Sequence, residues 1–160
     1  MKEILREIGN IYRCLDSLSN VEFKQFNLAK GQYSYLVRIC ENPGIIQERV
    51  AEMLKVDRAT ASRAIQKLEQ SEFIIKKGNP DNKKVLLLFP TEKGERLYKI
   101  LHEEEMFSNK VALENLSDEE QKNLATLLKK IRTNLEPDWI MVKKGGQREY
   151  LNKFNELNFK

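Results

Sequence analysis

Two short amphipathic segments joined by only three residues constrain the fold more than any other feature of this 160-residue sequence. Apolar side chains recur at helical spacing in both segments, over residues 45–54 and 58–71. Asp57 precedes the second segment, where its carboxylate can accept the free backbone N–H groups of a first helical turn. So short a connection prevents the two helices from lying antiparallel side by side. The sequence therefore predicts a helix-turn-helix crossing.

A basic β-hairpin is expected directly after this pair of helices. Residues 73–77 and 85–89 are rich in β-prone apolar side chains, and the segment 78–82 between them is dense in turn-forming residues. Four lysines surround the predicted turn: Lys76, Lys77, Lys83 and Lys84. The hairpin would therefore form a basic wing beside the second helix.

Amphipathic helices longer than this small unit needs are predicted at both ends of the chain. Residues 1–18 carry a narrow apolar seam of the kind found in coiled coils, and a further helix is expected over 30–41. Thr91 should cap a helix over 92–114, and Ser117 begins a capping box for another helix, which Pro137 should end. Such faces favour dimerisation, with candidate contacts at Ile4, Ile8, Ile11, Leu15, Leu124, Leu128 and Ile131.

The net charge of +4 is concentrated in the centre and in the C-terminal tail. Residues 58–90 carry seven basic and three acidic side chains, whereas residues 91–138 carry eight and eleven. Residues 139–160 carry five and two, and a short helix with Tyr150, Leu151, Phe154 and Leu157 on one side is expected there. A local basic excess indicates a surface that meets an anionic polymer, although a solvated basic face explains the charge equally well.

Membrane proteins, metalloproteins and enzymes are classes that the sequence does not favour. No apolar run approaches the roughly 20 residues that span a bilayer, and the N-terminus lacks the pattern of a signal peptide, so a cytoplasmic location is expected. Cys14 and Cys40 provide no disulfide framework, and the single histidine, His102, cannot build a zinc site. Without a catalytic motif or a metal-ligand cluster, neither enzymatic activity nor a cofactor is expected.

The second helix and the wing together supply side chains suited to double-stranded DNA. A recognition helix turns its N-terminal residues toward base edges in the major groove, where arginine binds guanine and short hydroxyls reach bases or phosphates. A lysine-rich wing can follow the neighbouring backbone or the minor groove. The helix face alone is equally explained as a polar surface, and a solvated lysine-rich turn alone is the commoner explanation for the wing, but the two elements together point to one ligand. The candidate DNA-binding residues are Arg58, Thr60, Ser62, Arg63, Lys67, Lys76, Lys77, Asn82, Lys83 and Lys84.

Four segments in their order along the chain carry a family resemblance. They read GQYSYL at 31–36, PGIIQ at 43–47, VAEMLKVDRATASR at 50–63 and PTEKG at 90–94. This order resembles the MarR family of winged-helix regulators, most of all its SlyA-like branch, and the likeness covers about residues 1–142. It implies a mainly α fold with a small β-hairpin wing. It also implies a homodimeric transcriptional regulator on an inverted-repeat operator, either a repressor or an activator.

The same resemblance implies a division of the chain into regions. Residues 1–27 would form the N-terminal dimerisation helix, 28–94 the winged helix-turn-helix region and 95–142 the C-terminal dimerisation helices, leaving 143–160 as a basic tail of unassigned role. The wing departs from the family, which often carries Asp and Arg where Asn82 and Lys84 stand. Lysine keeps the charge but loses the planar fork, so a weaker or less shape-selective contact with the minor groove is expected.

Family members often respond to small aromatic or phenolic effectors, which implies a pocket between the dimerisation and DNA-binding regions. Tyr12, Tyr33 and Tyr35 are candidates to line it, although aromatic residues at helical spacing more often form plain core. The residues around Cys14 do not match a peroxide-sensing motif, so redox sensing is not expected. The alternative function is a protein–protein interaction platform on a winged-helix core, which would not bind DNA in a salt-sensitive way.

Overall fold

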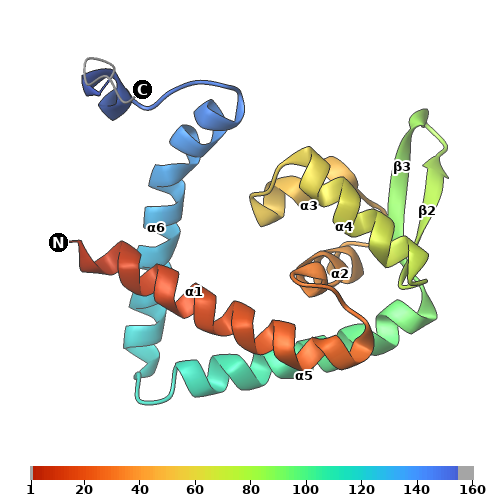
Figure 1. Ribbon diagram of the computed structural model, residues 1–160. Coiled ribbons are helices and arrows are strands. Elements are labelled where there is room, and N and C mark those ends of the chain that lie inside the picture. Colours follow the sequence, from red (N-terminus) through yellow and green to blue (C-terminus); the bar gives the residue numbers. More distant parts are fainter. Residues whose placement is uncertain (1, 155–160) are drawn as a thin grey trace. The chain divides into compact units, whose positions relative to one another are not determined.

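The computed structural model describes residues 2–154, and the chain divides into two compact units, Met1–Val111 and Ala112–Lys160. The first unit is a winged helix with a helix before it and a helix after it (Figure 1). Its elements are α1 (Glu3–Glu22), the short 3-10 helix η1 (Phe23–Phe26), α2 (Gln32–Glu41), β1 (Ile45–Ile46), α3 (Gln47–Leu54), α4 (Arg58–Gln70), β2 (Ile74–Asn79), β3 (Asn82–Pro90) and α5 (Glu92–Ala112). The second unit holds α6 (Asp118–Lys143) and the 3-10 helix η2 (Glu149–Lys153). The expected mainly α fold with a small hairpin is confirmed.

The helix-turn-helix consists of α3 and α4. Lys55 adopts the left-handed conformation at the C-terminus of α3, with a φ of 55°, and turns the chain out of the first helix. The side chain of Asp57 caps α4, as the sequence predicted. The apolar faces of both helices are buried, and this fixes the crossing that the short connection requires.

A three-stranded antiparallel sheet forms the wing and its base, in the order β1-β3-β2. Residues 45 and 46 were expected to begin a helix, and this prediction was wrong. Ile45 pairs with Leu88 and Ile46 with Leu87 of β3, so the helix begins only at Gln47. The β-branched isoleucines favour an extended chain, and the pairing partner lies too far along the sequence for a periodicity to reveal it.

One hydrophobic core joins the helices and strands of the first unit. It draws on α2, α3, α4, both long strands and α5, because each of these elements turns an apolar face inward. Leu36, Ile39, Ile65 and Leu68 are fully buried in it. Within the described residues, the buried hydrophobic side chains are Phe23, Leu28, Tyr35, Leu36, Ile39, Val50, Ala51, Ala61, Ile65, Leu68, Phe73, Ile74, Leu88, Leu97 and Leu101.

The second unit is one long helix and a short C-terminal segment. The Glu120 carboxylate accepts from the backbone N–H of Ser117 at 2.8 Å, and the Ser117 hydroxyl accepts from the backbone N–H of Glu120 at 3.3 Å, which completes the predicted capping box. The expectation that Pro137 ends this helix was wrong, because α6 continues to Lys143. Proline removes one hydrogen-bond donor but has a φ already near the helical value, so the residues after it can resume the helix.

The segment after α6 is held to that helix by an ion pair and contains an aromatic contact of its own. Arg148 Nε lies 2.7 Å from Asp138 Oδ2, and the Tyr150 and Phe154 rings meet edge to face with centroids 6.3 Å apart. Three members of the short helix expected here lie in or beside η2, and the fourth, Leu157, lies outside the described residues. No helix in residues 2–154 is long and apolar enough to cross a membrane.

Candidate nucleic-acid interface

Asp57 orders the first turn of α4. Its Oδ1 accepts a hydrogen bond from the backbone N–H of Thr60 at 2.8 Å, and its Oδ2 accepts one from the Thr60 hydroxyl at 2.6 Å. These bonds favour the charged carboxylate, and the side-chain bond is the largest reason why the pKa of Asp57 lies below its ordinary value. The carboxylate therefore caps the helix and orients a hydroxyl that the sequence singled out.

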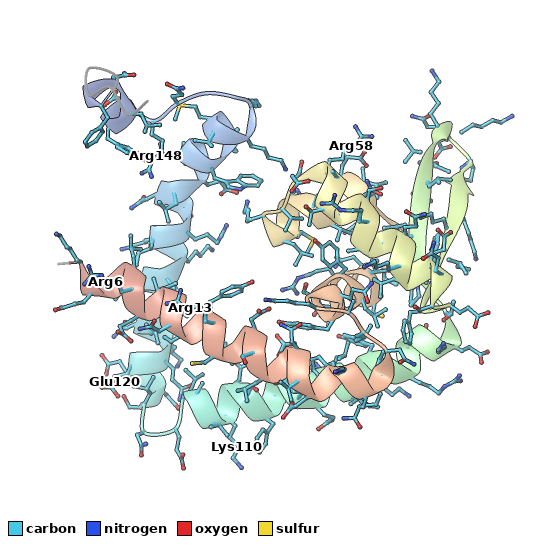
Figure 2. The ribbon with its side chains drawn as sticks, in the orientation of Figure 1. Arg6, Arg13, Arg58, Lys110, Glu120 and Arg148 are labelled. Atoms are coloured by element: carbon cyan, nitrogen blue, oxygen red, sulfur yellow. The ribbon has the colours of Figure 1, made fainter. Side chains whose placement is uncertain are left out.

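The face of α4 opposite its buried side is polar and basic. Ala61, Ile65 and Leu68 have no exposed surface. Thr60 is half-buried, and four candidate residues of this helix are exposed: Arg58, Ser62, Arg63 and Lys67. Figure 2 shows Arg58 on the outer side of the helix-turn-helix. The helix thus presents a row of cationic and hydroxyl groups to solvent, as an interface with a polyanion requires.

Both arginines of this face have partners within the protein. Arg58 Nη2 lies 3.0 Å from Glu48 Oε1 of α3, and Arg63 Nη2 donates to Thr60 Oγ1 at 3.3 Å. An exposed ion pair contributes only about 0.2–1 kcal/mol, so a DNA phosphate or base can replace the carboxylate. The sequence reasoning missed Glu48, because a contact between two helices leaves no signal in the periodicity of either one.

Two of the four wing lysines are held at the base of the hairpin. Lys76 Nζ lies 2.6 Å from Glu69 Oε2 of α4, and only 22% of the Lys76 side chain is exposed. Lys77 Nζ lies 5.0 Å from the centroid of the Phe89 ring, within the range of a cation–π contact. Lys76 therefore ties the wing to the second helix of the motif, a role that its charge in the sequence did not reveal.

The other candidate residues of the wing lie at its tip. Asn82, Lys83 and Lys84 are all exposed, and Asn82 Oδ1 accepts from the backbone N–H of Lys84 at 3.1 Å. Figure 1 shows the hairpin of β2 and β3 extending beyond the helices to its tip. The tip is the part of the wing whose charges can reach a neighbouring DNA backbone.

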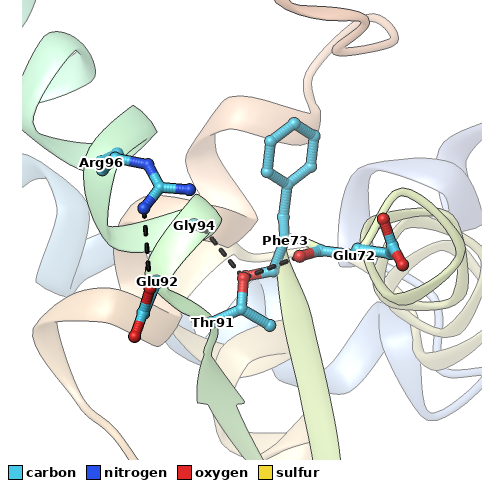
Figure 3. A network of polar contacts seen from close by, with 6 residues as sticks. All are labelled: Glu72, Phe73, Thr91, Glu92, Gly94 and Arg96. Carbon is cyan, nitrogen blue, oxygen red and sulfur yellow. Dashed lines mark hydrogen bonds and ion pairs between the residues drawn. The ribbon is translucent and has the colours of Figure 1, made fainter.

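A compact network of polar contacts fastens the wing to the start of α5 (Figure 3). The Thr91 hydroxyl donates to the backbone oxygen of Glu72 at 2.7 Å and accepts from the N–H of Gly94 at 3.1 Å. Lys93 Nζ donates to the backbone oxygen of Ser71 at 2.8 Å. A Cβ at Gly94 would stand 2.1 Å from the backbone oxygen of Phe73, so only glycine permits this approach.

An open cleft with a volume of about 850 Å³ lies beside the polar, basic face of α4. It is lined by the three tyrosines proposed from sequence, Tyr12, Tyr33 and Tyr35, and by α4 residues that include Arg63. Burial is the main cause that raises the pKa of Tyr33 and of Tyr35, so their phenols stay neutral. Gln32 also lines the cleft, and its Nε2 is the buried side-chain polar atom without a hydrogen-bond partner among the described residues. Sequence reasoning did not identify Gln32.

The candidate dimerisation residues leave much apolar surface uncovered in the single chain. Ile8 and Ile131 are half-buried, and the other five are exposed: Ile4, Ile11, Leu15, Leu124 and Leu128. No described residue of α6 is buried. Cys14 is exposed on α1, while burial raises the pKa of the Cys40 thiol to about 12. No group of three or more potential metal ligands occurs within residues 2–154.

The sequence and the fold both match known transcriptional regulators. The model of the MarR family matches residues 28–86. An uncharacterised HTH-type transcriptional regulator of Bacillus subtilis, YybA, is 56% identical over 94% of this chain and all of its own length. The chain belongs to the MarR family. It is a transcriptional regulator with a winged-helix fold and not an enzyme.

Two solved structures of MarR regulators resemble this one over most of its length. A MarR-family regulator of Listeria monocytogenes, solved with a 26mer DNA, is 57% identical, with a TM-score of 0.91 over 94% of this chain and all of that one. A structure of the transcriptional regulator SlyA is 53% identical, with a TM-score of 0.83 over 87% of this chain and 98% of that one. The MarR resemblance, including its SlyA-like character, is therefore confirmed.

Proposed function

We propose that the protein is a homodimeric regulator that binds an inverted repeat in double-stranded DNA in a sequence-specific manner, and that it acts in the cytoplasm. Residues 28–94 carry DNA binding, while residues 1–27 and 95–142 carry dimerisation. The exposed face of α4 enters the major groove, and the tip of the wing lies on the flanking backbone. The tail from residue 143 has no assigned role.

The observation that carries this proposal is the basic, exposed face of α4, which lies opposite the fully buried Ala61, Ile65 and Leu68 of the same helix. Arg58 and Arg63 offer planar forks suited to guanine, and Ser62 offers a short hydroxyl. Lys83 and Lys84 add exposed charge at the tip of the neighbouring hairpin. The Listeria relative, 57% identical, was solved with a 26mer DNA, which supports the same ligand for this chain.

Dimerisation is supported by the apolar residues that the single chain leaves exposed. Leu124 and Leu128 of α6 are 39% and 40% exposed, and Ile4 and Ile11 of α1 are 48% and 56% exposed. Covering such side chains contributes roughly 25 cal/mol per Å² of apolar surface removed from water. A second copy supplies the same apolar faces and the two-fold symmetry that an inverted repeat requires.

Release by a small aromatic effector is supported by the cleft beside α4. The unpartnered Nε2 of Gln32 provides a donor there, and the neutral phenols of Tyr33 and Tyr35 provide further polar groups on aromatic rings. Arg63 lines the same cleft, so a molecule bound there would compete with DNA for the Arg63 side chain. An aromatic acid that releases wild-type protein from its operator, but not the Gln32→Leu variant, supports this role; equal release of both contradicts it.

The deciding experiment is selection of bound sequences from a random duplex pool by the full chain. Recovery of an inverted repeat, bound by a dimer with an affinity that falls steeply as salt rises, is the expected result, because phosphate neutralisation releases counterions. Recovery of no preferred sequence would overturn sequence-specific regulation. A complete lack of salt-sensitive binding would favour the interaction platform instead.

A further inference from the structure

Three side chains on the first two turns of α4 are joined in one line of hydrogen bonds. Arg63 Nη2 donates to Thr60 Oγ1 at 3.3 Å, and the Thr60 hydroxyl donates to Asp57 Oδ2 at 2.6 Å. Residues three apart on a helix lie on one face, so this order follows from the spacing of the three residues. The line runs from the cap of the helix to an exposed guanidinium.

The chemistry of the three groups fixes the direction of each bond. A carboxylate is an acceptor only, and the pKa of Asp57 lies below its ordinary value, so the Thr60 hydroxyl must donate to it. A hydroxyl has a single proton, and this one is committed to Asp57. What remains on Thr60 Oγ1 is lone-pair capacity, which accepts from Arg63. Thr60 therefore has no proton with which to contact a phosphate oxygen or a base acceptor while the line is intact.

Arg63 keeps most of its binding capacity in this arrangement. A guanidinium has five N–H donors, and the bond to Thr60 uses one of them, which leaves donors for the bidentate contact that arginine makes with guanine. A long exposed side chain otherwise loses rotamer freedom when it binds DNA. A bond that already restrains Arg63 in the free protein reduces this loss.

We propose that Thr60 and Asp57 are positioning residues, which hold Arg63 in register with one base pair and do not themselves contact a base. This inference rests on the proposed function, in that Arg63 must read DNA. The candidate residues near the start of α4 then have different roles. Arg63 reads the base pair, whereas Thr60 holds Arg63 in a fixed position relative to the Asp57 cap. Arg58 lies outside this line, because its partner is Glu48 on α3.

The test uses the full chain and the operator recovered from the random pool, together with duplexes changed at each position in turn. Dissociation constants are measured for the wild type and for Arg63→Ala, Thr60→Val, Thr60→Ser and the double variant Thr60→Val/Arg63→Ala. Valine keeps the branched shape of threonine and removes the hydroxyl, whereas serine keeps the hydroxyl. Glu52→Gln is the matched control, since it removes an exposed carboxylate of α3 whose partner, Arg49, is not among the candidate DNA-binding residues. Circular dichroism checks that each variant is folded.

Thr60→Val should lose discrimination at the same base pair as Arg63→Ala, by roughly three- to tenfold, as expected for two coupled residues. Thr60→Ser should restore it, and Thr60→Val should add nothing once Arg63 is gone. The dependence of affinity on salt should not change in Thr60→Val, because no phosphate contact is lost. Glu52→Gln should leave discrimination at that base pair intact.

Four results would overturn the inference. Loss of discrimination at a different base pair in Thr60→Val would mean that Thr60 reads a base, and a flatter salt dependence would mean that it contacts a phosphate. If the effects of Thr60→Val and Arg63→Ala simply add in the double variant, the two residues are not coupled. An unchanged base preference in Arg63→Ala would show that Arg63 does not read that base pair. A wild type without any preferred sequence would instead refute the proposed function itself.

Discussion

Helices α4 and α6 are both amphipathic and both begin with a side-chain cap, yet they differ in what covers their apolar residues. Ile65 and Leu68 of α4 are fully buried by the rest of the winged helix. In α6 no described residue is buried, and Leu127 is 55% exposed. An apolar stripe thus indicates which face of a helix will be covered, but not which chain covers it. The winged helix has its core within one chain, whereas the apolar face of α6 is exposed in the single chain, and we propose that a second copy covers it.

The largest effect should come from removing core side chains in α4. We expect Ile65→Ala to lower the free energy of unfolding by about 2–5 kcal/mol, because it leaves a cavity in a fully buried site. Ile65→Val, the matched control, should cost about 0.5–1.5 kcal/mol. Urea unfolding measures both. A loss below that of the valine variant would show that the core of the winged helix tolerates a cavity.

A charge on the exposed apolar face of α6 should act on assembly and not on the fold of one chain. We expect Leu128→Glu to raise the dissociation constant of the dimer at least about tenfold, because a carboxylate would be buried at the interface. Thr126→Glu adds the same charge about 200° around the helix, as the turn per residue requires, and should leave the dimer intact. Sedimentation equilibrium measures the mass of each. A dimer that survives Leu128→Glu would contradict this assignment of the α6 face.

DNA binding should depend on the wing tip and not on the basic C-terminal tail. Lys84→Ala should weaken binding several-fold and reduce the slope of affinity against salt by about 1, since one phosphate contact is lost. Lys144→Ala, which removes an equal charge from the tail, should change neither quantity. Fluorescence anisotropy at several salt concentrations measures both. An equal loss of slope in the two variants would make the tail part of the DNA-binding surface.

The smallest effect should appear at acid pH, and it should be shared by α4 and α6. Hydrogen bonds from Thr60 lower the pKa of Asp57, and hydrogen bonds from Ser117 lower that of Glu120. Each carboxylate therefore stabilises its helix above its ordinary pKa of about 4, and this contribution is lost as the pH falls through the lowered value. The difference in stability between the wild type and Asp57→Ala or Glu120→Gln should shrink below about pH 4. A difference that stays constant down to pH 2 would contradict this linkage.

Local patterns in the sequence predicted most of this fold. The helical periodicity of residues 58–71, the Asp57 cap and the Ser117 capping box all act within a few residues, so they can be recognised without a structure. The two errors arose where a local rule met a wider context. Ile45 and Ile46 pair with a strand about 40 residues away. Pro137 lies inside α6, which continues to Lys143, because the φ of proline is already near the helical value.

The candidate site was predictable in composition but not in connectivity. The charges and hydroxyls of α4 and the wing are evident in the sequence, and the structure brings them onto neighbouring elements. What the sequence does not reveal is which cation already has a partner. Lys76 is paired with Glu69 and Arg58 with Glu48, and both pairs join different elements. The buried amide of Gln32 was missed for the same reason, since burial depends on contacts that no local pattern reports.

The close approach at Gly94 has a mechanical consequence. The first turn of α5 packs directly against the backbone oxygen of Phe73, and Thr91 and Lys93 donate hydrogen bonds to the carbonyls of Glu72 and Ser71. The start of α5 is therefore held tightly against the base of the hairpin. If the first turn of α5 tilts, the wing must therefore move with it as one rigid body. In the homodimer that we propose, the C-terminal ends of the two α5 helices would then set the distance between the two wings.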